Sequence, residues 1–93
     1  MQLSSRSKPG VVAGPIANNA REAVENGGPI RRVIISCAGK EAMLVALKAV
    51  FLACRFLGKE GLALSIVPEF ENVQNGPSLV HLFTLIHAPG EKL

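Results

Sequence analysis

The sequence contains no aspartate, no tryptophan and no tyrosine, and each absence narrows what the protein can do. With seven glutamates as its only carboxylate side chains and no closely spaced histidine pair, the chain offers few metal ligands, and we expect neither a metal nor a cofactor. The two cysteines, Cys37 and Cys54, belong to no zinc or redox motif and sit in apolar stretches. They are predicted to be buried free thiols.

Residues for catalysis are equally scarce. His81 and His87 share one face of a predicted strand with Phe83 and Leu85, which favours packing or a position at a dimer edge over acid–base chemistry. No base is evident beside either cysteine, and the Gly27-Gly28 pair precedes a strand instead of joining a strand to a helix, so no phosphate loop is present. We therefore predict a protein that is not an enzyme and has no catalytic residues.

The composition is that of a folded domain with a slight positive charge. Of the 93 residues, 48% are hydrophobic and only 18% are charged, with ten lysines and arginines against seven glutamates, a net charge of +3. This length predicts one domain over residues 1–93. Because the N-terminal residues do not resemble a signal peptide, we expect the cytoplasm as the compartment, with or without attachment to the nucleoid.

The stretch from Lys40 to Leu57 carries its only charges at Lys40, Glu41, Lys48 and Arg55 and is otherwise apolar on nearly every side of a helix. A membrane span is disfavoured because Lys48 falls near its middle. A chain of this size has little material to cover such a helix, so we expect a second copy to do so, in a homodimer or a tetramer. The residues expected at that interface are Leu47, Val50, Phe51, Cys54 and Phe83.

Turn residues divide the chain into six elements. They are a short edge strand within residues 2–7, a helix ending near Asn26, a strand over 31–37, the long helix, a strand from Leu62 through Pro68 and Phe70 to Val73, and a last strand over 79–87. Pro15 lacks an N–H group, which predicts that the first helix begins at Val11 or Val12. The predicted order is β-α-β-α-β-β.

Several short motifs follow one another in this order. They are Ser5-Arg6-Ser7-Lys8-Pro9, Val12-Ala13-Gly14, Gly39-x-x-Ala42, Lys48-Ala49-Val50, Phe56-Leu57, Gly61-x-x-Leu64 and Val67-Pro68-x-Phe70. Together, over about residues 3 to 87, they resemble the stage V sporulation protein S family. That resemblance implies an α+β fold, a two-layer Alba-like sandwich with a mixed four-stranded sheet and two helices on one face. It also implies a dimer with a regulatory role through binding of DNA or RNA.

Cations gather at the ends of predicted elements. Arg6 and Lys8 precede the first helix, Arg31 and Arg32 open the second strand, and Lys40 begins the long helix. The two strand-to-helix loops are expected at one edge of the sheet, where the cations can contact a phosphate backbone. The alternative for Arg31 and Arg32 is that they flank the strand at its opposite end. A second stripe, of Lys48, Arg55 and Lys59, is interpreted as a solvated helix face.

The sequence departs from the family pattern at two places. Leu44-Val45 stands where the family usually carries Asn-Gln, and the hairpin loop over 69–78 contains Glu69 and Glu71 but no cation. An Alba protein extends a basic hairpin along DNA. An alternative function therefore stays open, a dimeric protein-interaction module of the same fold that does not bind nucleic acid.

Overall fold

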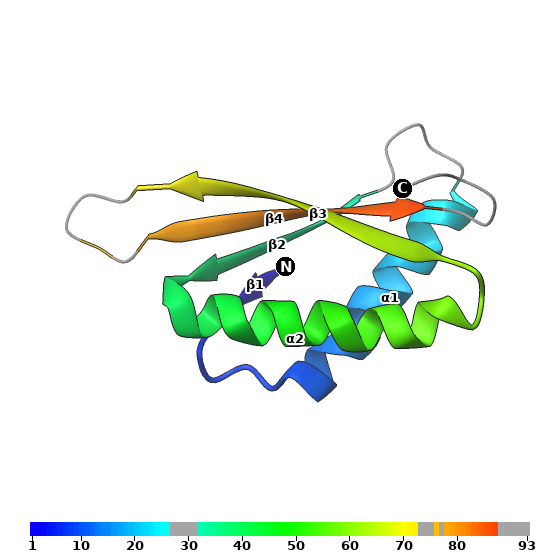
Figure 1. Cartoon of the computed structure of the whole chain (residues 1–93), viewed down its shortest axis with the longest axis horizontal. Coiled ribbons are helices and arrows are strands. Elements are labelled where there is room, and N and C mark those ends of the chain that lie inside the picture. Colours follow the sequence, from blue (N-terminus) through cyan, green and yellow to red (C-terminus); the bar gives the residue numbers. More distant parts are fainter. Residues whose placement is uncertain (27–31, 73–75, 77, 88–93) are drawn as a thin grey trace.

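A computed structural model describes residues 1–26, 32–72, 76 and 78–87, and shows a four-stranded sheet with both helices on one of its faces (Figure 1). In chain order the elements are β1 (Gln2–Leu3), α1 (Pro9–Glu25), β2 (Arg32–Ala38), α2 (Gly39–Gly58), β3 (Ala63–Glu71) and β4 (Leu79–His87). The predicted α+β class, the element order and the two-layer arrangement are confirmed. The expected edge strand over 2–7 is shorter than predicted, because the chain turns immediately after Leu3.

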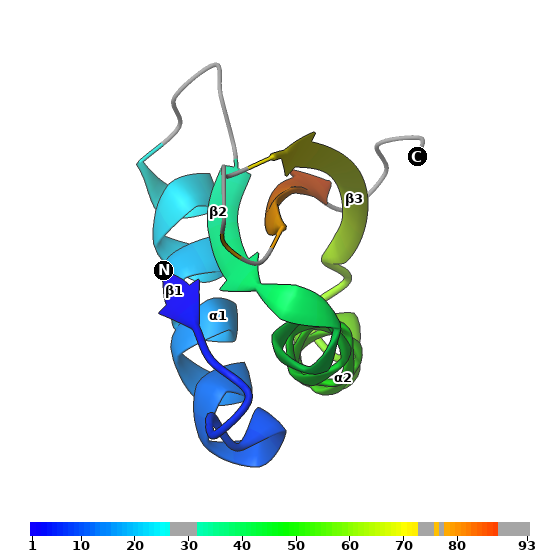
Figure 2. The same ribbon diagram turned by 90° about the vertical axis from the view of Figure 1, so that its left-hand side faces the viewer.

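The sheet is mixed, with strand order β1-β2-β4-β3. β1 runs parallel to β2, with Leu3 beside Cys37, and the other pairs are antiparallel. Consequently β1 and β2 end at the same edge, where the β3–β4 hairpin also turns (Figure 2). β3, which contains Pro68, is an edge strand, a position that tolerates a residue without an N–H group.

Alternation along β2 and β4 separates a covered face from an open one. Val33, Ile35 and Cys37 are buried beneath the helices, and so are Val80, Leu82, Thr84 and Ile86 of β4. The residues between them, Arg32 and Ile34 among them, point to the other face, which no described element covers. The sequence showed apolar residues on both faces of these strands, yet the fold supplies helices for only one.

Helix α1 begins at Pro9, two or three residues before the predicted start at Val11 or Val12. Pro9 occupies its first turn, where its missing N–H is one of those that have no intrahelical partner, and Lys8 precedes it in an extended conformation. Pro15 therefore lies inside the helix, not in its first turn, and removes one backbone hydrogen bond there. Pro15 is exposed, so the carbonyl that loses its partner is on the side near water. Ala13, Ile16, Ala17 and Ala20 form its buried face.

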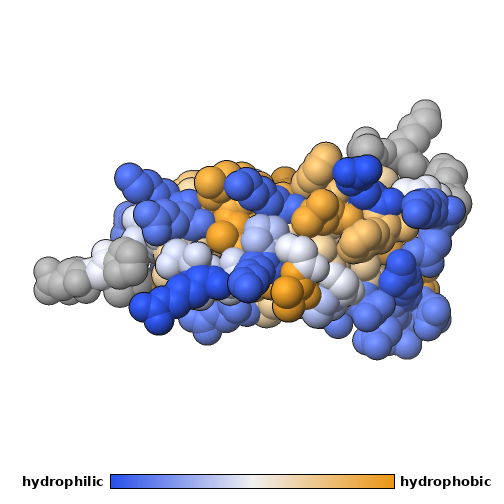
Figure 3. Space-filling view, turned by 90° about the horizontal axis from the view of Figure 1, so that it is seen from below, coloured by the Kyte–Doolittle hydropathy of each residue, from blue (hydrophilic) through white to orange (hydrophobic). Residues whose placement is uncertain are grey.

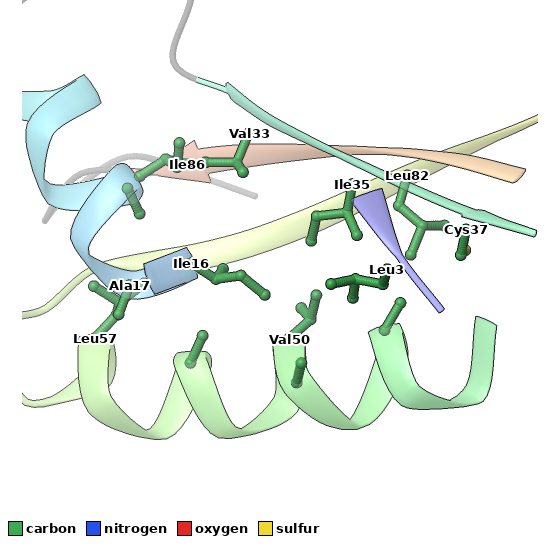
Figure 4. Packing of buried hydrophobic residues seen from close by; sticks show 14 of the residues in the cluster. Leu3, Ile16, Ala17, Val33, Ile35, Cys37, Val50, Leu57, Leu82 and Ile86 are labelled. Carbon is green, nitrogen blue, oxygen red and sulfur yellow. The ribbon is translucent and has the colours of Figure 1, made fainter. Parts of the chain in front are cut away.

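Helix α2 approaches the sheet and α1 closely because its inner face is made of small side chains. Ala42, Ala46, Ala49 and Ala53 are fully buried, and Val50 and Leu57 complete that face. Figure 4 shows Val50 pointing toward Leu3 and Ile35 of the sheet, and Leu57 lying beside Ala17 of α1. Gly39, with a φ of 84°, makes the sharp turn from β2 into this helix. The core is thus built between an alanine face and branched side chains of the sheet.

The buried alanines of α2 predict that a larger side chain at one of these positions destabilises the fold. Ala46→Leu adds three carbon atoms where Ala46 has no exposed surface, so we expect it to lower the free energy of unfolding by about 1–3 kcal/mol. Lys48→Leu, which introduces the same side chain at an exposed position of the same helix, is the control and is expected to change stability by less than about 0.5 kcal/mol. Urea unfolding followed by circular dichroism measures both. Equal stability of the two variants would contradict tight packing at Ala46.

Candidate nucleic-acid interface

The loop between β1 and α1 is a compact turn held by serine side chains. The N–H of Ser4 donates to the Ser7 hydroxyl at 3.1 Å, and the N–H of Arg6 donates to the Ser4 hydroxyl at 3.2 Å. The N–H of Ser7 donates in turn to the carbonyl of Ser4 at 3.1 Å. These local bonds fix the backbone, so Arg6 is presented at the outside of a defined turn with its side chain exposed.

This turn lies beside the start of α2, as predicted. Since Leu3 pairs with Cys37, the next residues along the two strands bring the turn against Ala38. An open cleft of about 420 Å³ separates them, lined by Gln2, Leu3, Ser4, Ser5, Ser7 and Ala38. Arg6, Lys8 and Lys40 are exposed around this edge of the molecule, which Figure 2 views directly. We call these three residues the edge cations.

Two of the edge cations occupy positions that are electrostatically unfavourable for their own helices. Lys8 is the N-cap of α1, and Lys40 lies in the first turn of α2, where the helix dipole favours negative charge. In the described structure neither Lys8 nor Ala38, the N-cap of α2, makes a side-chain capping bond. The N–H of Gly39 donates a hydrogen bond to the carbonyl of Ser78 at 3.0 Å. Glu41 is the one carboxylate in the first turn of α2.

The other predicted nucleic-acid residues do not join this group. Arg32 begins β2, six residues before Ala38, so about 20 Å of strand separates it from the edge cations. It lies on the open face, with its guanidinium 5.6 Å from the centre of the Phe83 ring. The topology thus supports the alternative given above for Arg32, that it flanks β2 at the end opposite the edge cations. Arg31 lies outside the described residues.

The carboxylates of the hairpin strand lie on the opposite side of the sheet from the helices. Glu69 pairs with His81 and Glu71 with Leu79, and directly paired residues share a face, here the open one. Phe70 points instead toward α2, where it lines a hollow of about 360 Å³ with Gly39, Lys40, Met43, Ser78 and Val80. The negative charge of the hairpin strand therefore lies away from the helical side, where Glu41 is the carboxylate nearest Lys40 in the described sequence.

The residues predicted at a dimer interface lie in three different environments. Leu47 and Phe51 are 46% and 61% exposed on α2, and Leu44, which was not predicted, is 54% exposed beside them. Val50 is buried in the core, and Cys54 is partly buried against it. Phe83 is on the open face of the sheet, away from α2. We call Leu44, Leu47 and Phe51 the α2 stripe.

Most of the four phenylalanines lie at the surface. Phe51, Phe56 and Phe70 are all exposed, Phe70 by 65%, and only Phe83 is partly buried. Figure 3, which looks onto the helical side, shows apolar surface interrupted by charged residues there. The sequence alone did not reveal this, since an aromatic residue in a helix of apolar composition looks the same whether it faces the sheet or water. The space beneath α2 is taken by alanines.

The two cysteines are free thiols, as predicted. Cys37 is buried in β2 and contacts the carbonyl of Val80 at 3.5 Å, whereas Cys54 is half-buried. Burial raises the pKa of both thiols above their ordinary value, and for Cys54 a hydrogen bond with the backbone of Leu64 partly offsets this rise in pKa. Both are thus held protonated, the opposite of what a nucleophile or a metal ligand needs.

The raised pKa values predict a pH dependence of stability. The folded state holds these thiol protons more tightly than the unfolded chain, so the stabilisation is complete below the ordinary thiol pKa, about 8.5, and is lost as the pH rises above it. Between pH 8 and 10 the chain should lose more stability than its Cys37→Ala, Cys54→Ala double variant. Urea unfolding across this range measures it, and parallel curves would contradict the assignment.

Two broader features of the described residues bear on function. In the described ranges, no cluster of three or more histidine, cysteine or acidic side chains is placed to hold a metal ion. Nor does either helix have the length and hydropathy required to cross a bilayer, as far as the chain is described.

The chain was also compared with known proteins. A family model described as Stage V sporulation protein S (SpoVS) matches residues 1–79. Among curated proteins, none matches the chain.

Proposed function

The chain belongs to the stage V sporulation protein S family, and from this premise we propose that it binds DNA or RNA as a dimer, without enzymatic activity, and acts as a regulatory or architectural factor. Family membership identifies the chain as a small protein of a sporulation-related family. The proposed binding is supported by topology: Arg6 and Lys8 follow β1 and Lys40 follows the parallel strand β2, and all three residues are exposed. Phosphates are the natural ligand for such an edge.

The strongest support comes from where the two lysines stand. A lysine at a helix N-terminus is unfavourable with respect to the helix dipole, yet this chain has one at the start of each of its described helices. At the start of α2 a phosphate can accept hydrogen bonds from main-chain N–H groups and pair with Lys40 at the same time, whereas at α1 Pro9 has no N–H and those of Val11 and Val12 donate to the Lys8 carbonyl. An anion therefore removes an electrostatic cost that the free protein carries, which makes these positions suited to backbone contacts.

Backbone contacts of this kind carry no base preference. Affinity then arises mainly from release of counterions and falls steeply with salt, in proportion to the number of phosphates neutralised. A dimer doubles the edge cations and the net charge of +3 per chain. The serine hydroxyls of the adjacent cleft add neutral donors to phosphate oxygens. Such a surface holds a duplex or a structured RNA without reading its sequence.

Reversal of the edge charge tests this proposal. Lys8→Glu combined with Lys40→Glu should weaken binding of labelled duplex DNA and of structured RNA at least about tenfold and reduce the salt dependence, because two phosphate contacts per chain are lost. Fluorescence anisotropy at two salt concentrations measures both. The matched control is Arg21→Glu combined with Lys59→Glu, which makes the same charge change on α1 and at the C-terminal end of α2, away from the edge cations and the α2 stripe.

The control pair should retain most of the affinity at equal salt, and sedimentation should show both double variants in the same oligomeric state. Equal loss in the two pairs would mean that only net charge matters, and would remove the edge cations as the site. No binding by the unaltered chain at low salt would overturn the proposal itself.

The proposed dimer uses the α2 stripe, because Leu44, Leu47 and Phe51 form an exposed apolar surface at helical spacing. Phe51→Glu places a charge in its middle and should shift the chain to a lower oligomeric state in sedimentation velocity at micromolar concentration. Phe56→Glu is the control, since Phe56 is exposed on another side of the same helix. An unchanged sedimentation coefficient for Phe51→Glu would contradict this interface.

A second candidate function rests on the hairpin strand. Glu69 and Glu71 give it negative charge, and Leu44-Val45 gives α2 an apolar surface where the family pattern is polar. Both features favour a protein partner over nucleic acid. In the anisotropy experiment, absence of binding at low salt supports this interaction module.

A further inference from the structure

Phe70 is the exposed end of a row of side chains that is otherwise buried. The strand register sets Leu3, Cys37, Val80 and Phe70 side by side across the four strands, on the face that the helices cover. The first three are at most 5% exposed, whereas Phe70 is 65% exposed. β3 is an outer strand, and its hairpin end extends past the start of α2 (Figure 1). An aromatic ring is therefore presented to solvent on the helical side, at an energetic cost that a ligand on it would remove.

This ring borders a hollow of about 360 Å³ between the hairpin and the first turns of α2. Met43 and Val80 add apolar lining to it. The carbonyl of Ser78, another lining residue, accepts the N–H of Gly39 at 3.0 Å and so ties the hairpin to the start of the helix. The walls of the hollow thus come from two elements that are bonded to each other. We call this space the Phe70 hollow.

The charge at the Phe70 hollow is positive. Lys40, one of the edge cations, is the one charged side chain among its described lining residues. The two carboxylates that flank Phe70 in the sequence point to the opposite face, because side chains alternate along a strand. Ala38 lines the serine cleft and Gly39 lines the Phe70 hollow, so the two depressions adjoin where β2 passes into α2. An aromatic wall therefore borders the candidate phosphate site.

We propose that the Phe70 hollow takes one unpaired base of a single-stranded segment of DNA or RNA, stacked on the ring of Phe70, while the adjoining phosphate pairs with Lys40. A nucleotide carries a flat apolar face and an anion in one unit, which matches the ring and the cation together. Stacking on an aromatic side chain tolerates any base, since every base has a π-face. The site therefore selects unpaired bases without reading a sequence.

A duplex cannot use this hollow. Both faces of a paired base are covered by its neighbours in the stack, so a duplex reaches the edge cations through its phosphates alone. The inference rests on the proposed function and narrows its ligand to nucleic acid with unpaired bases. It separates the two contributions to binding, a salt-dependent one from the cations and a stacking one from Phe70.

Removal of the ring tests the proposal. Phe70→Ala should weaken binding of a labelled oligothymidine and of a labelled oligouridine about tenfold, because the stacking surface is lost. Binding of a duplex at the same salt concentration should change less than about twofold, because the phosphate contacts remain. Phe70→Trp keeps a flat ring and should retain the affinity for single strands. Fluorescence anisotropy of the full chain measures each, and the two oligonucleotides distinguish DNA from RNA.

The matched control is Phe56→Ala. Phe56 is also an exposed phenylalanine, but it lies toward the other end of α2, away from the Phe70 hollow, so its removal should leave all three affinities unchanged. Sedimentation should show every variant in the same oligomeric state as the unaltered chain. In NMR spectra, the ring protons of Phe70 should shift when oligothymidine is added, because a stacked base changes their magnetic environment, and those of Phe56 should not.

The outcomes separate this inference from the proposed function. Equal effects of Phe70→Ala on single strands and duplex, or no effect on either, would overturn base binding at the Phe70 hollow. If Lys8→Glu with Lys40→Glu still lowers affinity in that case, the proposed function stands on phosphate contacts alone. Failure of the unaltered chain to bind any of the three nucleic acids at low salt would overturn the proposed function, and this inference with it.

Discussion

The structure depends on close contact of the alanine face of α2 with the sheet on one side and with α1 on the other. Ala42, Ala46, Ala49 and Ala53 let the helix approach both the sheet and α1, so one helix closes the core of a small domain. A side chain of ordinary size in the same places would push α2 outward and open the core. The alanines of the inner face also affect the outer surface of α2. Because alanines supply the inner contacts, the large side chains of this helix, Phe51 and Leu47, are left on its surface.

Much of the fold was predictable from the sequence, for reasons tied to particular residues. A run with apolar residues on both faces, preceded by a glycine–proline turn signal, predicted β4 at Leu79–His87. Glycines and prolines marked most other boundaries, and the resemblance ordered the layers. The start of α1 was predicted wrongly because Pro9 and Pro15 each fit a first turn, and only the tertiary structure shows that Pro9 takes that place. Which face of an apolar strand is covered depends on the helices, so Phe83 and Ile34 could not be assigned in advance.

The candidate site was predictable where it rested on topology. Because β1 and β2 are parallel, the loops that follow them start at the same end of the sheet, and these loops carry Arg6, Lys8 and Lys40. Composition could not show that Arg32 lies far from these residues, because its distance from them depends on the direction in which β2 runs. Surfaces of three kinds result: a cationic edge, an apolar helix stripe and a sheet face with charges of opposite sign at its ends. The sheet face lies opposite the helices, whereas the cationic edge and the helix stripe share α2, on which Lys40 and Leu44 are one turn apart.

Pro68 in β3 bears on how such a protein stays in solution at high concentration. β3 is a nine-residue edge strand, and a long free edge normally acts as a template on which a strand from another molecule adds, the first step toward fibrils. A proline near its middle cannot donate a main-chain hydrogen bond, and the carboxylates of Glu69 and Glu71 repel a like strand. Growth of the sheet from one molecule to the next is therefore blocked, and association is restricted to contacts between side chains.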